Sequence, residues 1–240
     1  MSRRRSFDTS QLRITRGALI VAGLQLGLSL VFLLSGSDTR ETLANWLVAT
    51  PSGVFHQGHV WTLATSPFVE VDFLSLLLGL FMLWAFIPTL ERFWGTPRFY
   101  RFFAITSLAG TIVGTAAGLA FGRDVPIIGI SPFIYGAMVA FGIVYAKQPV
   151  QFFGVLPLTG RQLMYGFIGF LVLYVGLQQA WEKGAAFAAA MIAAALMTSK
   201  RVSPSLAWKR WRIARARARL SVIDGGAPRP RRKRDERFLN

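Results

Sequence analysis

The sequence has no cysteine and few of the side chains that hold metals or carry acid–base chemistry. Its 240 residues include no Cys, two His and 11 acidic residues. Without Cys there are no disulfides and no Cys-ligated metal sites, and with so few His and acids we expect no metal and no cofactor. Charged residues make up 16% of the chain, against about a quarter in soluble proteins, which argues against an ordinary soluble enzyme.

Apolar residues are abundant instead and lie in six long stretches. They reach 53% of the chain, too many for a disordered protein. About 20 apolar residues cross a bilayer as a helix. The sequence therefore predicts an all-α, polytopic membrane helical bundle of six transmembrane helices without an internal repeat. The predicted spans are 14–34, 71–90, 99–121, 126–146, 163–180 and 184–198. They form one membrane domain over 14–199, between a basic arm (1–13) and a basic tail (200–240).

Basic residues predict the orientation of this bundle. With six spans, 24 of the 27 Lys and Arg fall on one side of the membrane. The positive-inside rule makes that side cytoplasmic, so both termini are expected there. Arginine outnumbers lysine 22 to 5, which is typical of a GC-rich bacterial genome and favours a bacterial inner membrane.

The tail accounts for most of the net charge of +16. We interpret 206–220 as a juxtamembrane helix that binds anionic lipid, since each basic residue near the surface contributes about 1 kcal/mol. Membrane lipids are therefore expected partners, and 225–240 is expected to be disordered. Binding of the tail to a specific partner stays open as an alternative, although no nucleic acid is expected.

Small residues predict which spans pack closely. Gly110, Gly114 and Gly118 recur every fourth residue on one helix face, where a second backbone can approach. Gly136 has the same spacing to a following alanine. The last span begins at Gly184 and is mostly alanine. We therefore expect the third, fourth and sixth spans to be in tight contact.

Four segments resemble, in order and spacing, the rhomboid superfamily of intramembrane serine proteases. The segment 59–68 is similar to the end of the rhomboid first loop, and 88–99 to the turn between the second and third spans. Gly129-Ile-Ser131 lies where the rhomboid nucleophile motif opens the fourth span, and Tyr135 follows at the family's spacing. The segment 152–158 resembles the Pro-containing loop before the fifth span. The resemblance implies a rhomboid-like bundle over about 15–198.

The same resemblance implies that the catalytic machinery is missing. Serine needs a base and donors for the oxyanion. The family takes its base from a His in the sixth span, but no His follows His59 here. The donor positions in the second span fall on Ser75 and Gly79, and Glu70 stands where many relatives have another His. Ser131 is followed by Pro, which favours a helix start with Ser131 as N-cap.

The sequence therefore predicts an inactive rhomboid-like protein with Ser131 as a vestigial nucleophile position. Inactive relatives bind transmembrane segments, which implies a client contact here formed by polar and motif residues of the old site. The expected contacts are Glu70, Asp72, Ser75, Gly79, Gly129, Ser131 and Tyr135. The polar residues Glu70 and Asp72 are alternatively solvated groups at the end of their span.

Two other functions remain open at this stage. One is an active intramembrane serine protease with a non-standard base, for which His56, His59 and Lys183 are the candidates. The other is an accessory subunit of a larger membrane complex that uses the bundle as a scaffold and the tail as a tether.

The orientation can be tested directly. Reporter fusions at Arg5 and at Asn240 should both report the cytoplasmic side, because an even number of spans returns the chain to the side from which it started. Readings on opposite sides would contradict the six-span topology.

Overall fold

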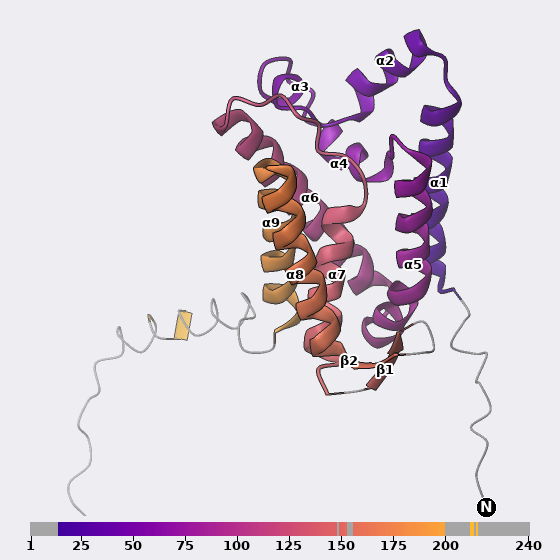
Figure 1. The fold of residues 1–240 in the computed structure, drawn as a ribbon, viewed down its shortest axis with the longest axis vertical. Coiled ribbons are helices and arrows are strands. Elements are labelled where there is room, and N and C mark those ends of the chain that lie inside the picture. Colours follow the sequence, from indigo (N-terminus) through magenta and orange to yellow (C-terminus); the bar gives the residue numbers. More distant parts are fainter. Residues whose placement is uncertain (1–13, 148, 153–155, 200–211, 214, 216–240) are drawn as a thin grey trace, which may run out of the picture. The chain divides into compact units, whose positions relative to one another are not determined.

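The computed structural model describes residues 14–147, 149–152, 156–199, 212–213 and 215. The fold is almost entirely helical (Figure 1). The predicted basic arm 1–13 and nearly all of the tail, including most of the helix predicted over 206–220, lie outside the described residues. The elements in chain order are α1 (Arg16–Leu34), α2 (Ser37–Leu47), α3 (Pro51–Phe55), α4 (Thr62–Thr65), η2 (Ser66–Phe68), α5 (Phe73–Trp94), α6 (Thr96–Ala120), α7 (Ser131–Val144), β1 (Pro149–Phe152), β2 (Leu156–Thr159), α8 (Gly160–Gln178) and α9 (Trp181–Thr198).

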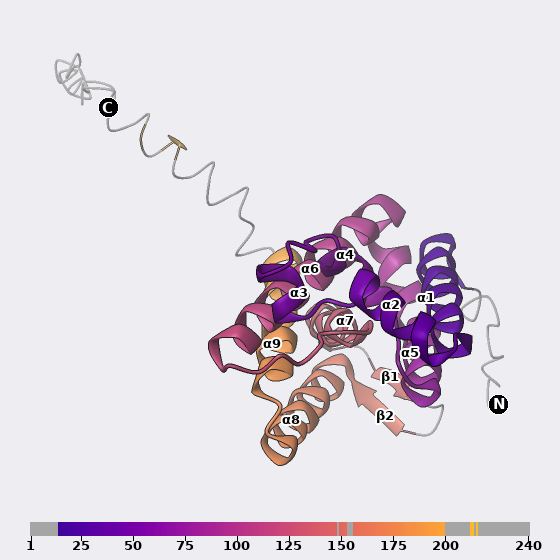
Figure 2. The same cartoon turned by 90° about the horizontal axis from the view of Figure 1, so that it is seen from above.

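Six helices form a bundle with α7 at its centre. Seen from above, α7 occupies the middle, with α1 and α5 on one side and α6, α9 and α8 around the rest (Figure 2). Its side chains are buried along most of its length. Phe133, for example, is 1% exposed and meets the rings of Phe99, Phe102 and Phe103 from α6. The central helix is therefore covered by protein.

The most extensive helix contacts in the bundle are those of α9 with α6 and with α7, and all three helices have small residues at four-residue spacing. A Cβ added to Gly114 would lie 2.8 Å from the Cβ of Ala186 on α9, and one added to Gly136 would lie 3.1 Å from the carbonyl of Ala190. Gly110 faces Pro132 of α7 and also the backbone of α9. These glycines let neighbouring backbones approach as a helix with larger side chains could not.

Two of the other glycines pack elsewhere. Gly118 lies against Pro51 of α3 and the carbonyl of Arg123, so it meets a connecting segment. Gly184 lies against Val175 of α8.

A buried carboxylate joins α1 to α5 at one end of the bundle. Glu91, near the end of α5, is 3% exposed. It accepts hydrogen bonds from the backbone N–H groups of Gly17 (2.9 Å) and Ala18 (2.8 Å) and from the hydroxyl of Thr15. The first N–H groups of a helix have no partner within it, so Glu91 caps α1 from another helix. Thr96 at the start of α6 donates to the same carboxylate (2.7 Å).

The number of helices that meet membrane length is smaller than predicted. Four of the described helices, α1, α5, α6 and α8, are long and apolar enough to cross a membrane. The predicted span 126–146 is helical only over Ser131–Val144, and 14 residues rise about 21 Å, less than a hydrocarbon core of about 30 Å. In α9 the first turn carries Glu182 and Lys183. An all-α membrane protein fits this structure, and six spans remain a prediction.

Two connections expected to be irregular are ordered. The segment 35–68 contains α2, α3, α4 and η2. Within 147–161, expected as a loop, β1 and β2 pair antiparallel, with Val150 opposite Leu158. The other described elements are helices, so this short strand pair leaves the predicted all-α class in place.

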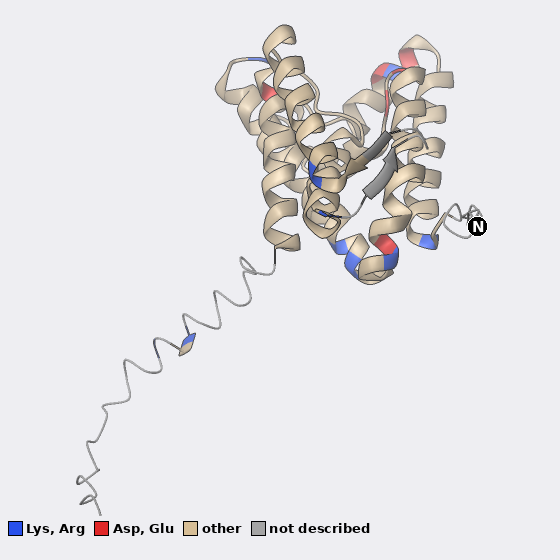
Figure 3. Cartoon of the chain, turned by 60° about the horizontal axis from the view of Figure 1, so that its bottom comes forward, with Lys and Arg blue, Asp and Glu red and all other residues tan. Residues whose placement is uncertain are grey.

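Charge is distributed unevenly along the bundle. Lys and Arg predominate at the end that includes the turn between α5 and α6, although an acid lies among them, whereas acidic and basic residues are mixed at the opposite end (Figure 3). This asymmetry is of the kind that the positive-inside rule uses, and the orientation itself stays a prediction.

The close contact between α6 and α9 predicts the effect of a large side chain. Replacing Gly114 by Leu should destabilise the protein by about 1–3 kcal/mol, because the new side chain forces two backbones apart. A lower midpoint in thermal unfolding of the detergent-purified protein would show this.

Gly166→Leu on α8 is the matched control, since a Cβ there has nothing within 4 Å. Equal destabilisation by both substitutions would contradict the packing explanation.

Candidate functional site

The segment before α7 is held by hydrogen bonds to residues of the 35–68 connection. The N–H of Ile127 donates to the carbonyl of Ala49 (2.9 Å), and the N–H of Gly129 donates to the carbonyl of Ser66 (3.1 Å). The hydroxyl of Ser66 donates in turn to the carbonyl of Ile127. Gly129 has φ +85°, a conformation that L side chains rarely adopt. These constraints keep 126–130 out of the helix and start α7 at Ser131.

Glu70 lies against this start. Its side chain is 5% exposed, and its Oε1 accepts a hydrogen bond from the backbone N–H of Ile130 (3.2 Å). A Cβ on Gly129 would lie 2.5 Å from the same oxygen, so the carboxylate occupies the space that a side chain at 129 would need. Negative charge is favourable at a helix N-terminus. Glu70 therefore positions the start of α7 from a distant part of the chain.

Two polar side chains of α1, which the sequence analysis missed, complete this cluster. Gln25 is fully buried, and its Nε2 donates to Glu70 Oε1 (3.5 Å). Ser29 is also fully buried; its hydroxyl accepts from the N–H of Glu70 (3.0 Å) and donates to the carbonyl of Phe68 (3.2 Å). Their four-residue spacing places both on one face of an apolar helix, and polar residues within such a helix are a functional signal.

Burial dominates the electrostatics of Glu70. It raises the pKa of this carboxyl from 4.5 to about 7; the Ile130 hydrogen bond lowers the pKa and the negative charge of Asp72 raises it. Protonated and ionised Glu70 are therefore both present near neutral pH.

Ser131 takes a different part from the one expected. It is the first residue of α7, partly exposed, while Ile130 occupies the N-cap position and no side chain of that residue caps the helix. The expectation that Ser131 is the N-cap and Pro132 the first helical residue is therefore wrong by one position. Within the described part of the chain, the Ser131 hydroxyl makes no hydrogen bond.

The other residues expected at the site are divided between two regions. Gly79 of α5 belongs to the Glu70 cluster, since a Cβ there would lie 2.9 Å from Gln25 Nε2 and 3.2 Å from Ile130. Tyr135 instead faces α8 and α9, with its ring 4.9 Å from that of Phe187.

Asp72 and Ser75 are exposed at the start of α5. Asp72 is the N-cap, and its carboxylate accepts from the N–H of Ser75 (2.8 Å). Hydrogen bonds from Ser75 hold the pKa of Asp72 below its ordinary value.

Neither histidine is bonded to Ser131 among the described residues. The ring of His59 packs beside those of Trp46 (5.5 Å) and Trp61 (4.8 Å), which also stack on each other (5.5 Å), and its Nδ1 is 3.2 Å from the carbonyl of Asn45. Trp61 donates from its indole nitrogen to the carbonyl of Trp46 (3.1 Å), which fixes this aromatic stack. His59 therefore belongs to an exposed cluster of rings.

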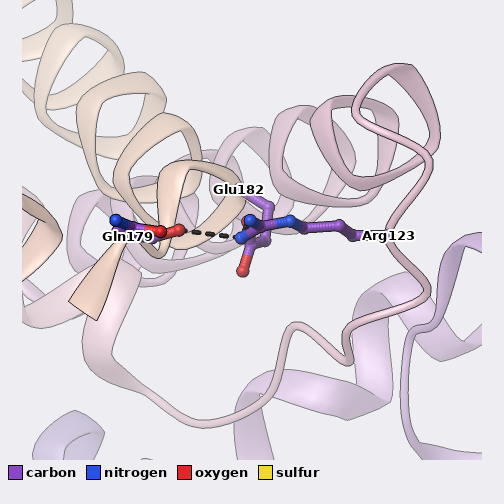
Figure 4. Close-up of polar contacts among 3 residues, drawn as sticks. All are labelled: Arg123, Gln179 and Glu182. Atoms are coloured by element: carbon purple, nitrogen blue, oxygen red, sulfur yellow. Dashed lines mark hydrogen bonds and ion pairs between the residues drawn. The ribbon is translucent and has the colours of Figure 1, made fainter.

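A third buried carboxylate, Glu182, lies in the first turn of α9, next to Lys183. Arg123 Nη1 is 3.7 Å from Glu182 Oε2 and donates to the carbonyl of Gln179 (2.8 Å), as Figure 4 shows. Glu182 is 3% exposed and the Arg123 side chain is 45% exposed. The pair therefore ties the connection after α6 to the start of α9.

A substitution at Gly129 tests the contact with Glu70. Gly129→Ala should lower the thermal unfolding midpoint more than Gly122→Ala, because both glycines have positive φ but only Gly129 has the carboxylate against it. The difference between the two variants isolates the contact from the backbone conformation.

The additional loss should shrink when Glu70 is also replaced by Ala, as expected for residues in contact. Equal losses at Gly129 and Gly122 in the presence of Glu70 would contradict this interpretation.

The chain matches one known protein family. Among curated proteins, none matches the chain. One family, described as eukaryotic integral membrane protein (DUF1751), matches residues 18–199, which include all six bundle helices except the first two residues of α1. The eukaryotic description does not fit the expected bacterial inner membrane. That expectation was based on arginine content, which reflects genome composition and not the kind of cell. The family is rhomboid-like in general kind. The chain belongs to the DUF1751 family of integral membrane proteins.

Proposed function

We propose that the protein is a non-catalytic, rhomboid-like membrane protein that binds transmembrane segments of client or partner proteins. The observation that carries this proposal is the setting of Ser131. A serine at the vestigial nucleophile position begins α7 without a hydrogen-bonded base among the described residues, and the amide before it donates to Glu70.

Acyl transfer would require the opposite arrangement. A nucleophilic serine needs a base within hydrogen-bond reach and donors directed at the developing oxyanion. His59 is held in its aromatic stack, and an ionised Glu70 places negative charge where donors are needed. Both features support a site that does not hydrolyse peptides.

The surface of α5 supports binding of a helix from the lipid. At its start, Phe73, Leu74, Leu77 and Leu78 are all more than half exposed. The exposed polar groups of Asp72 and Ser75 lie at the same end of this helix. The helix α8, which like α5 packs against α7, exposes Phe170, Leu173 and Leu177. A client helix beside α5 and α8 would meet apolar surface along its length and polar groups near one end.

Cross-linking combined with a serine probe tests this function. A photo-reactive residue at Leu77 should cross-link to a transmembrane client, and Ser131→Ala should leave that cross-linking unchanged. The protein should not react with a fluorophosphonate probe and should not cleave transmembrane substrates, because its serine lacks a base.

The same photo-reactive residue at Ile112 of α6 is the control, since Ile112 is 47% and Leu77 52% exposed. Equal cross-linking at both positions would contradict a defined client surface. Probe labelling that is lost in Ser131→Ala would establish an active protease. If the residue at Leu77 cross-linked to a single protein that also co-purifies in a stoichiometric ratio, the function of an accessory subunit would be favoured.

A further inference from the structure

Two carboxylates in the bundle are buried to a similar degree but receive very different numbers of hydrogen bonds. Glu91 is 3% exposed and accepts from two backbone amides and two hydroxyls. Glu70 is 5% exposed and accepts from one backbone amide at 3.2 Å and one side-chain amide at 3.5 Å. A buried negative charge is costly unless it is paired or well hydrogen-bonded, so Glu70 has too few donors for a permanently ionised group.

The side chain beside Glu70 can accept a hydrogen bond from its protonated form. Gln25 Oε1 is buried and has no hydrogen-bond partner among the described residues. An amide carries a donor and an acceptor at its two ends. A half-turn of the Gln25 amide presents Oε1 to a Glu70 hydroxyl, so the pair forms a hydrogen bond in either protonation state, with its direction reversed.

Two of the groups that face Glu70, the amides of Ile130 and Gln25, donate to its ionised form, whereas burial and the charge of Asp72 favour the neutral form and outweigh them. From α1 it meets Gln25 and Ser29, and from the start of α7 the amide of Ile130, none of which titrates near neutral pH. From the start of α5 it experiences the charge of Asp72, which is negative. No cation among the described residues is paired with Glu70.

We propose that Glu70 is a proton-binding site that responds to pH near neutrality and sets how firmly the start of α7 is held against α1. With a proton bound, Glu70 and Gln25 form a neutral hydrogen-bonded pair in a dry environment. Without it, a poorly solvated charge lies between Gln25 of α1 and the start of α7 and draws in water, which weakens the hydrogen bonds that join the two through Glu70. This inference does not depend on client binding.

The sign of the pH dependence follows from the two protonation equilibria. The pKa of Glu70 is about 7 in the folded protein, against an ordinary value of 4.5. Between these values the folded chain retains a proton that the unfolded chain has lost. Stability therefore falls as pH rises through this window and levels off above about 7.

Thermal unfolding of the full chain in detergent tests the proposal. Between about pH 5 and about pH 8, the wild-type midpoint should fall by several degrees more than that of Glu70→Gln, which mimics the protonated form. Asp72→Asn should move the wild-type transition to lower pH, because it removes the negative neighbour. Identical pH profiles for wild type and Glu70→Gln would overturn the proposal.

Infrared spectroscopy provides a second readout if Glu70→Gln does not fold. The wild type should show the carbonyl stretch of a protonated carboxylic acid that disappears as pH rises through about 7, and Gln25→Leu should shift that band. Absence of the band across this range, or a band that neither Gln25→Leu nor Asp72→Asn changes, would also overturn the proposal.

Discussion

Two buried carboxylates, Glu91 and Glu70, fix how α1, α5 and α7 pack together. Each binds the start of a helix that is distant from it in the sequence. Glu91 holds the first turn of α1, and Glu70 holds the residue from which α7 begins. The N–H groups at a helix start have no partner within the helix, and a membrane interior offers no water in exchange. The two contacts therefore fix where α1 and the central helix α7 begin relative to α5.

Each of these carboxylates needs a glycine opposite it. A Cβ would lie 2.6 Å from Glu91 Oε1 at Gly17 and 2.5 Å from Glu70 Oε1 at Gly129. An oxygen that accepts from backbone amides must approach the backbone closely, and a side chain would hold it away. Glycine at these positions is thus the counterpart of the acid, although 74 residues separate Gly17 from Glu91.

Much of the bundle could be predicted from local sequence, and the errors have a common cause. Hydrophobic stretches of membrane length gave the existence and order of the six helices, and small residues every four positions indicated how α6, α7 and α9 approach. The start of α7 was placed five residues early, because 126–130 are as apolar as the helix that follows. What keeps them out of the helix is pairing with Ala49 and Ser66, far away in sequence.

The candidate site was only partly predictable, because contacts between segments far apart in the sequence complete it. Glu70, Gly79 and Gly129 do meet around Ile130. Gln25 and Ser29 were overlooked because they lie in a span whose apolar content dominates its interpretation. Asp72 and Ser75 form a local cap that is readable from their spacing, whereas the contact between Gln25 and Glu70 depends on how α1 packs against α5.

The glycine and the serine of the Gly129-Ile-Ser131 motif have different reasons for being present. Gly129 is required by its positive φ and by the carboxylate beside it, so it would persist whether or not the protein performs chemistry. Ser131 has no comparable structural duty, since its hydroxyl neither caps α7 nor bonds to another described residue. The glycine half of the motif is therefore explained by architecture alone. Asp72 and Ser75 also have a structural role as the cap of α5, so a functional explanation is needed only for the serine. The exposed groups of Asp72 and Ser75 are polar members of the predicted set that a partner helix could reach.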